Sequence, residues 1–385
     1  MGIHFTKEQW EHVKSNYTAW WEQKLNRPLI SIQIRNAYPP EREEPDVPLL
    51  TQANCHRLDI PAEKVIDRID YELSTYAFLG DAYPMVNMWS FGPSCLAGFC
   101  GAELKNDTGN VWYQCPKKDI EDIHIQYDPE NVWAKRIKEL YRTGLRRWEG
   151  QVVMSMPDLG GFQDVIANFT GSQELLLQCA MAAEDEDEAQ EMERLRNEAY
   201  MAWVEAYKDL SSVLQEEGCP GYTDWGGIFS CTPSYILQDD FAYMIGEKDY
   251  LQYGYPEIQK ACETLDHTIY HLDGVGNLRH LDTLLENPEL NAIQWVYGAG
   301  QPSARHWLEV YDKIYRAGKN IECIGDLEDF QILREKYGSH LFYQCTVDGS
   351  DGLAARLEEE KDCLHSYRIF PVEQKEKVLA LLKNL

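Results

Sequence analysis

The chain has 385 residues, and its 44% hydrophobic and 12% aromatic content is that of a packed globular protein rather than a disordered chain. Its 36 Lys and Arg against 64 Asp and Glu give a formal net charge of -28, which disfavours binding to nucleic acids and to anionic membranes. No apolar stretch reaches the ~20 residues that span a bilayer, and the N-terminus has no apolar signal core, so we expect a cytoplasmic protein without a membrane partner.

Short apolar runs alternate with helical patterns along the whole chain. Helices, in which apolar residues recur every three to four positions, are predicted at 7–26, 62–79, 131–149, 172–217 and 303–318. Strands are predicted at 29–35, 85–91, 151–158, 221–230, 267–274, 291–298, 320–326 and 341–348. The first helix precedes the first strand, so residues 1–27 are expected to form an N-terminal helical extension that caps the fold or offers a partner surface.

Eight strands that alternate with helices predict an α/β fold. No Pro/Gly/Ser-rich linker divides the chain, so we expect a single domain over residues 1–385. This pattern favours a (β/α)8 TIM barrel over an open doubly wound sheet. No GxGxxG motif follows the first strand, which counts against a dinucleotide-binding fold.

In (β/α)8 barrels, the chemistry lies at the C-terminal ends of the strands. We expect catalytic residues among the acidic and imidazole side chains at these ends, which are Asp158, Asp224, His271 and Asp273. We expect substrate contacts from the arginine, glutamine and aromatic residues at these ends, which are Arg35, Trp89, Trp225, Gln294, Trp295 and Tyr297. A pocket walled by such aromatic residues would suit a flat or apolar small molecule.

His271 and Asp273 stand two positions apart at the end of one predicted strand. Side chains of a strand alternate between its faces, so these two point the same way. Without a metal, Asp273 would orient His271 and stabilise its charge, which makes the imidazole a general acid or base near neutral pH. The alternative is that His271 is a buried core residue whose ring nitrogens are hydrogen-bonded within the protein. The carboxylate of Asp273 on the same face makes this alternative less favoured.

The eleven cysteines are scattered, without a CxxC pair. An odd number without framework spacing indicates reduced thiols. Most are expected to be small buried residues, but Cys323 and Cys345 fall in the last two predicted strands, where they could reach the site.

Several segments resemble the uroporphyrinogen decarboxylase superfamily. In the second half these are "DWGGIFSCTPSYILQDDFAYM" (224–244), "YHLDGVGNLRHLD" (270–282) and "NPELNAIQWVYGAG" (287–300), and in the first half "FGPSCLAGFCGAE" (91–103) and "MPDLGGFQDVIANFTGSQELLL" (156–177). The resemblance extends over most of the chain. It implies a (β/α)8 barrel and either decarboxylation or methyl transfer linked to a corrinoid or another coenzyme.

The segment after the first strand departs from the decarboxylase pattern. The decarboxylase carries an arginine-containing, glycine-rich motif there for its substrate's carboxylates, but this chain reads "IRNAYPPEREEP". A strongly anionic tetrapyrrole would also be repelled by the net charge of -28. Porphyrinogen decarboxylation is therefore disfavoured.

The strand that carries His271 departs from the zinc methyltransferases of the superfamily. They have a His-x-Cys pair on this strand and a distant Cys, whereas this chain has His271-x-Asp273. Zinc also accepts carboxylate oxygen, so the resemblance still allows a zinc site with His271, Asp273 and a third ligand. Cys323 and Cys345 are candidates, with Glu322 as the alternative to Cys323 because neighbouring strand residues face opposite sides.

Three functions follow from these patterns. The first, which we favour, is a methyltransferase that moves a methyl group from a small O- or N-methylated donor to a separate corrinoid protein or another thiol or cofactor acceptor. Zinc is the candidate metal for this reaction. The chain has no "DxHxxG" segment, so cobalamin would be carried by a partner. The second is a metal-free decarboxylase or lyase of a small carboxylate that uses His271 and Asp273. The third is a non-catalytic ligand-binding barrel.

Overall fold

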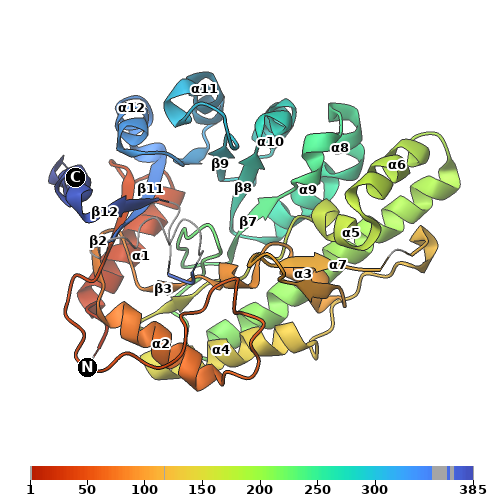
Figure 1. Ribbon diagram of the computed structural model, residues 1–385. Coiled ribbons are helices and arrows are strands. Elements are labelled where there is room, and N and C mark those ends of the chain that lie inside the picture. The colour runs from red at the N-terminus through yellow and green to blue at the C-terminus, as the bar shows by residue number, and fades with distance from the viewer. Residues whose placement is uncertain (1, 117, 349–361, 365–367, 385) are drawn as a thin grey trace.

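Parallel strands form the centre of the structure (Figure 1), a computed structural model that describes residues 2–116, 118–348, 362–364 and 368–384. The main sheet follows the order β2-β1-β11-β10-β9-β8-β7, and β12 pairs with β11. Its strands are β1 (Leu29–Arg35), β2 (Ala77–Gly80), β7 (Ser234–Gln238), β8 (His267–Asp273), β9 (Ala292–Val296), β10 (Asn320–Glu322), β11 (Leu341–Asp348) and β12 (Ile369–Pro371). Two further pairs are parallel β3 (Met85–Val86) with β6 (Val153–Met154), and antiparallel β4 (Glu103–Lys105) with β5 (Trp112–Gln114).

Helices flank the strands on both sides, with α10, α11 and α12 along one edge of Figure 1 and α2 and α4 along the opposite edge. The helices are α1 (Lys7–Trp21), α2 (Ala62–Ser74), α3 (Cys95–Phe99), α4 (Val132–Trp148), α5 (Phe162–Thr170), α6 (Ser172–Ala182), α7 (Glu186–Glu216), α8 (Glu247–Tyr253), α9 (Tyr255–Thr264), α10 (Leu281–Glu286), α11 (Leu308–Arg316), α12 (Leu327–Tyr337) and α14 (Lys375–Leu379). In the described part of the chain, none of the helices combines the length and apolar character needed to cross a membrane.

The strands predicted in the second half are largely confirmed. β8, β9, β10 and β11 lie within the predicted ranges and pair in parallel, and in the first half β1 has the predicted bounds. Two predicted strands are much shorter, because β3 and β6 have only two residues each. After β3 the chain turns into a 3-10 helix at Met88–Phe91, which begins where the Asn87 side chain accepts a hydrogen bond from the Trp89 N–H.

The prediction of a strand at 221–230 is wrong. Gly227 adopts a positive φ of 82°, which suits a turn rather than an extended strand, and the Asp224 carboxylate accepts a hydrogen bond from the Gly226 N–H at 2.8 Å. A single antiparallel bridge joins Tyr222 and Ser230. The strand of this region is β7, a few residues later, where all five side chains are buried.

The described strand pairing does not confirm a closed barrel. The edge of β1 opposite β11 is occupied by β2, which runs antiparallel, and not by β3. The helix predicted at 62–79 ends at Ser74, and the residues after it form β2. β3 and β6 form a separate pair, and β6 leads to Met156, whose N–H donates to Thr223 O at 2.8 Å. The structure therefore shows an α/β fold with a parallel central sheet.

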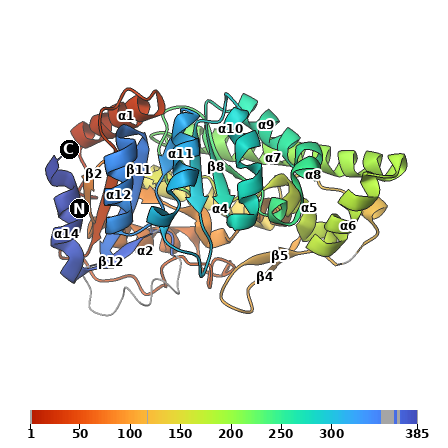
Figure 2. The ribbon, with the colours of Figure 1, turned by 90° about the horizontal axis from the view of Figure 1, so that it is seen from above.

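Helix α1 covers the N-terminal ends of the strands. Its Tyr17 and Trp20 have no exposed surface, and Trp20 O accepts a hydrogen bond from the side chain of Asn320 at the start of β10. The Trp21 ring stacks on His267 at the start of β8, with the ring centroids 4.5 Å apart. In Figure 2, α1 and the β4–β5 hairpin lie along opposite edges of the molecule. The N-terminal extension is thus part of the core. It covers the N-terminal ends of the strands and does not cover their C-terminal ends.

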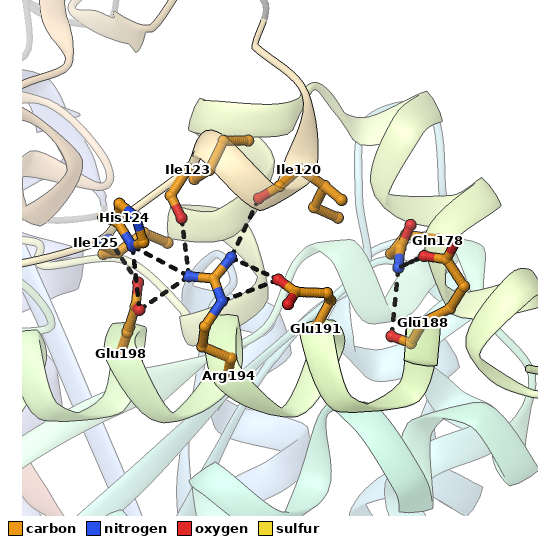
Figure 3. Close-up of polar contacts among 9 residues, drawn as sticks. All are labelled: Ile120, Ile123, His124, Ile125, Gln178, Glu188, Glu191, Arg194 and Glu198. Atoms are coloured by element: carbon orange, nitrogen blue, oxygen red, sulfur yellow. Dashed lines mark hydrogen bonds and ion pairs between the residues drawn. The ribbon is translucent and has the colours of Figure 1, made fainter. Parts of the chain in front are cut away.

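Arg194 and Glu198 of α7 bind the segment after the β4–β5 hairpin (Figure 3). The Arg194 guanidinium donates to Ile120 O at 3.1 Å and Ile123 O at 2.9 Å. Glu191 and Glu198, one helical turn to either side, form ion pairs with it. Glu198 also accepts a hydrogen bond from the Ile125 N–H at 2.8 Å. This network holds the segment that follows β5, the strand that carries Trp112 and Tyr113.

Candidate functional site

A cavity of about 880 Å³ lies at the C-terminal ends of the strands. Side chains from β7, β8 and the loops after β3 and β6 line it, together with residues of the β4–β5 hairpin. Five of the residues predicted from the sequence are among its lining, namely Trp89, Asp158, Trp225, His271 and Asp273. Its position is the one at which α/β sheets bind their ligands.

His271 and Asp273 meet a third residue, Asp240, in this cavity. One potential ligand atom from each of the three lies within 4.8 Å of those of the other two. His271 and Asp273 point to one face because they are two positions apart on β8. Asp240 follows the end of the neighbouring strand β7, whose Gln238 is the register partner of His271. Two carboxylates and an imidazole thus lie close together at the C-terminal ends of β7 and β8.

A row of polar residues stands behind His271. Gln238, His271, Gln294 and Glu322 are successive register partners across β7, β8, β9 and β10. His271 Nδ1 is hydrogen-bonded to Gln294 Oε1. The Gln294 amide in turn donates to Glu322 Oε2 at 2.7 Å. Gln344 on β11 donates to Glu322 Oε1 at 3.0 Å and to Gly226 O at 2.6 Å.

This row fixes the protonation of the imidazole. An amide oxygen only accepts hydrogen bonds, so Nδ1 of His271 carries a proton. Burial lowers the pKa of His271, which favours the neutral ring, and its Nε2 is then the atom that can bind a metal or accept a proton. Burial also raises the pKa of Glu322, to about 8, against the opposing effect of the two glutamine amides. His271 is therefore oriented by a second layer of hydrogen bonds, as metal-binding histidines commonly are.

Acidic residues dominate one side of the cavity. Burial is the main cause that raises the pKa of Asp158, and the charges of Asp240 and Asp164 add to it. Burial and then the charge of Asp240 raise the pKa of Asp164 to about 7. Desolvation of its carboxyl group and then the charge of Asp273 raise the pKa of Asp240 to about 7, although the residue as a whole is exposed. These carboxyl groups lie close enough to disfavour one another's ionisation.

Aromatic side chains also line the cavity. The rings of Trp89 and Trp225 have centroids 5.2 Å apart, and Trp225 meets the His271 ring edge to face with the centroids 5.0 Å apart. Phe241 and Tyr243, from the 3-10 helix after Asp240, also line the cavity. The pocket therefore presents indole and phenyl faces as well as carboxylates.

Three of the predicted substrate contacts do not line the cavity. Arg35 is 3% exposed, and its guanidinium pairs with Asp362 at 3.1 Å and with Asp348 at 3.8 Å. Trp295 is fully buried and packs against Trp307. Tyr297 is half-buried, packed against the hydrophobic core. Gln294, a fourth predicted contact, reaches the cavity only through its hydrogen bond to His271.

Four other predicted residues also lie outside the cavity lining. Asp224 is buried in the turn after Thr223, and burial raises its pKa to about 7. Glu322 stands behind Gln294. Cys345 follows Gln344 on β11, and Cys323 directly follows Glu322, the last residue of β10. Neighbouring residues of an extended chain face opposite sides, and both cysteines are buried. Burial raises the pKa of both thiols.

Sequence reasoning missed Asp240, Asp164, Gln238 and Gln344. The signal for Asp240 was present, because an Asp239–Asp240 pair directly follows the apolar run at 234–238. The strand was placed at 221–230, so this pair was not recognised as a strand end. Asp164 lies in α5 and accepts hydrogen bonds from the N–H groups of Asp240 at 3.0 Å and Phe241 at 2.8 Å. It holds the loop that carries Asp240.

Comparisons with known proteins show a similarity of fold to a solved structure. No protein-family model and no curated protein matches the chain. Among solved structures, the chain is similar to a methyltransferase from Methanosarcina mazei, with 12% sequence identity and a TM-score of 0.53. The match covers 86% of this chain and 92% of that one. The two proteins thus share an overall fold at very low identity.

Proposed function

We propose that this protein is a methyltransferase that moves a methyl group from a small O- or N-methylated donor to an acceptor nucleophile. The acceptor would be a thiol or the reduced cobalt of a corrinoid on a separate protein. The observation that carries the proposal is the group of Asp240, His271 and Asp273 at the mouth of the sheet. The fold likeness to a methyltransferase supports it. We also propose that the strands form a variant of the (β/α)8 barrel in which β2 occupies one edge of β1.

The chemistry of the three residues fits zinc. Imidazole nitrogen and carboxylate oxygen are both zinc ligands, and three protein ligands leave a position for a substrate. Asp240 takes the place that the sequence assigned to a cysteine or Glu322. The hydrogen bond from His271 Nδ1 to Gln294 leaves Nε2 for the metal. Zinc bound there would act as a Lewis acid that lowers the pKa of the acceptor or polarises the leaving atom.

The residues of the chain bind and orient the donor. The bond between the methyl carbon and oxygen or nitrogen breaks, and its electron pair stays on that oxygen or nitrogen. The acceptor's electron pair forms the new bond to carbon. Trp89 and Trp225 cover one side of the donor and exclude water, and Asp158 offers an oxygen from the other side. Alignment of donor and acceptor is the main contribution that such a pocket makes.

A metal-free lyase or decarboxylase that uses His271 and Asp273 is less well supported. Such an enzyme has to bind the carboxylate of its substrate. The described lining of the cavity contains five aspartates and neither lysine nor arginine. A small carboxylate would find no cationic partner among these side chains.

The test is the zinc content of protein purified without added metal. We expect about one zinc per chain in the wild type, and its loss in His271→Ala and in Asp240→Asn. His306→Ala changes an exposed histidine of the 3-10 helix Ala304–His306 and should keep the metal. Zinc-loaded protein should then demethylate O- or N-methylated donors when a corrinoid protein or thiol is present. Absence of zinc after reconstitution under reducing conditions would refute the metal site, and a His271→Ala variant that keeps ligand affinity and has no activity to lose would favour a binding protein.

A further inference from the structure

The acidic side of the cavity has no cationic partner among the described side chains. Asp158, Asp164, Asp240 and Asp273 all line the cavity, and none of them has a Lys or Arg nitrogen within 4.0 Å in the described part of the chain. Asp362, in contrast, lines the same cavity and is paired with Arg35. Of the four, Asp158 is buried, Asp164 and Asp273 are half-buried, and Asp240 is exposed. A buried carboxylate is usually paired or bound to a cation, because desolvated negative charge is costly.

Three buried acceptor atoms of lining residues, Asp158 Oδ2, Gln238 Oε1 and Asn168 Oδ1, and one donor, Trp225 Nε1, have no hydrogen-bond partner among the described residues. Asp158 is 1% exposed, and its Oδ1 accepts a hydrogen bond from the Gly160 N–H at 2.8 Å. Its Oδ2 is left without a partner. Gln238 is 5% exposed, and its Oε1 is likewise without a partner. Since buried polar atoms are almost always satisfied, both oxygens indicate a ligand that is positively charged or donates hydrogen bonds.

The aromatic residues of the cavity lining indicate which kind of cation would bind. Trp89, Trp225, Phe241 and Tyr243 line the cavity, and an indole or phenyl face attracts a cation that lies over it. Methylated ammonium groups suit such faces because their charge is spread over carbon-bound hydrogens and they shed water easily. A metal ion alone would satisfy Asp240, His271 and Asp273 but would leave Asp158 Oδ2 and Gln238 Oε1 without a partner.

From these contacts we propose that the cavity binds an organic cation with methyl groups on nitrogen, so that the methyl donor is a methylated ammonium compound. The identification of this ligand as the donor rests on the proposed methyltransferase function. A volume of about 880 Å³ is ample for such a small molecule. Asp158 and Gln238 bind the positive end, and the indoles of Trp89 and Trp225 cover the methyl groups.

Methyl transfer from such an ammonium donor accounts for every bond and electron pair. A methyl carbon–nitrogen bond of the ammonium breaks, and its electron pair stays on nitrogen, which becomes a neutral amine. A thiolate or the reduced cobalt of a corrinoid supplies the electron pair for the new bond to carbon. The loss of positive charge weakens the hold of the carboxylates on the product, and this favours its release.

Binding of choline chloride and of its neutral isostere 3,3-dimethylbutan-1-ol tests this inference. The two compounds differ only in the charged nitrogen, and quenching of tryptophan fluorescence or calorimetry measures both without a methyl acceptor. We expect the wild type to bind choline at least tenfold more tightly. Asp158→Asn should weaken choline binding at least fivefold and leave binding of the alcohol unchanged. Asp187→Asn, an exposed change on α7, is the matched control.

Equal affinity for the two compounds would overturn the inference, as would unchanged choline binding in Asp158→Asn. Thermal melting shows whether Asp158→Asn is folded, and Gln238→Met provides a second variant that should lose choline affinity selectively. The two proposals fail separately. Tight choline binding without methyl transfer to any acceptor refutes the methyltransferase but keeps the ligand class, whereas demethylation of neutral methyl ethers with equal affinity for the two probes refutes only the ligand class.

Discussion

His271 on β8 and Gln294 on β9 are register partners, and the imidazole Nδ1 is hydrogen-bonded to the amide Oε1. The same amide donates to Glu322 on β10, so its orientation is set by a carboxyl group that never reaches the cavity. The imidazole presents Nε2 to the site because the register of three neighbouring strands places these side chains next to one another. The pairing of β8, β9 and β10 therefore sets the orientation of His271.

Replacement of Gln294 should weaken metal binding without removing a ligand. In Gln294→Met the imidazole loses the acceptor for its Nδ1 proton, and loss of such a partner typically lowers metal affinity by about 10–100-fold. Competition with a zinc chelator measures the affinity, and nitrogen NMR of His271 reports a change of tautomer. Gln301→Met, at an exposed position, should behave as the wild type. Unchanged affinity and tautomer would show that the hydrogen bond does not orient His271.

Glu322 should make the protein less stable as the pH rises. Burial raises its pKa to about 8 in the folded protein, so between the unfolded pKa near 4.5 and pH 8 the folded state binds more protons than the unfolded one. Stability then falls with increasing pH over this window, by at most about 1.4 kcal/mol per pH unit for one group. Burial raises the pKa of Asp224 to about 7 and contributes in the same direction.

Urea unfolding at pH 5, 6, 7 and 8 checks this dependence. Glu322→Gln removes the titrating group and should show a shallower decline than the wild type. Exposed Glu43→Gln is the control and should keep the wild-type slope. Parallel curves for wild type and Glu322→Gln would mean that Glu322 has no raised pKa in the folded protein.

Removal of the Trp20 side chain should destabilise the whole protein, because α1 is part of the core. Trp20 is fully buried against the start of the strands, near Phe342. A buried Trp→Ala change costs about 3–5 kcal/mol. Chemical unfolding of Trp20→Ala measures the loss, and Met201→Ala, at a residue that is 51% exposed, should cost little. A loss below 1 kcal/mol would indicate that α1 is only loosely attached.

Arg194→Gln should loosen residues 120–125 locally. It removes charge-assisted hydrogen bonds to Ile120 O and Ile123 O, and such bonds are worth about 1.5–3 kcal/mol each. Amide hydrogen exchange should accelerate in this segment and remain unchanged in the central strands. Arg146→Gln breaks an ion pair whose arginine is 67% exposed, and such surface pairs contribute about 0–1 kcal/mol. Equal exchange in the two variants would contradict the role of Arg194.

The sequence by itself determined strands β8 to β11 and the shared face of His271 and Asp273. The alternation of side chains along a strand is a local property, so two residues of β8 that are two positions apart had to share a face. The bounds of β1 followed in the same way from the continuous run "LISIQIR". The segment "GYTDWGGIFS" does not form the predicted strand, because its Gly226–Gly227 pair allows a turn that apolar content alone does not reveal.

Only the tertiary structure decided which residues share the cavity. Asp240 joins His271 because β7 pairs with β8 in one particular register, and Arg35 is withdrawn from the site by Asp362, which lies 327 positions away. Cys323 and Cys345 are turned away because Glu322 and Gln344 occupy the inner face. These contacts join segments that are distant in the sequence. Their free energies depend on burial and on neighbouring charges, and neither can be read from local sequence patterns.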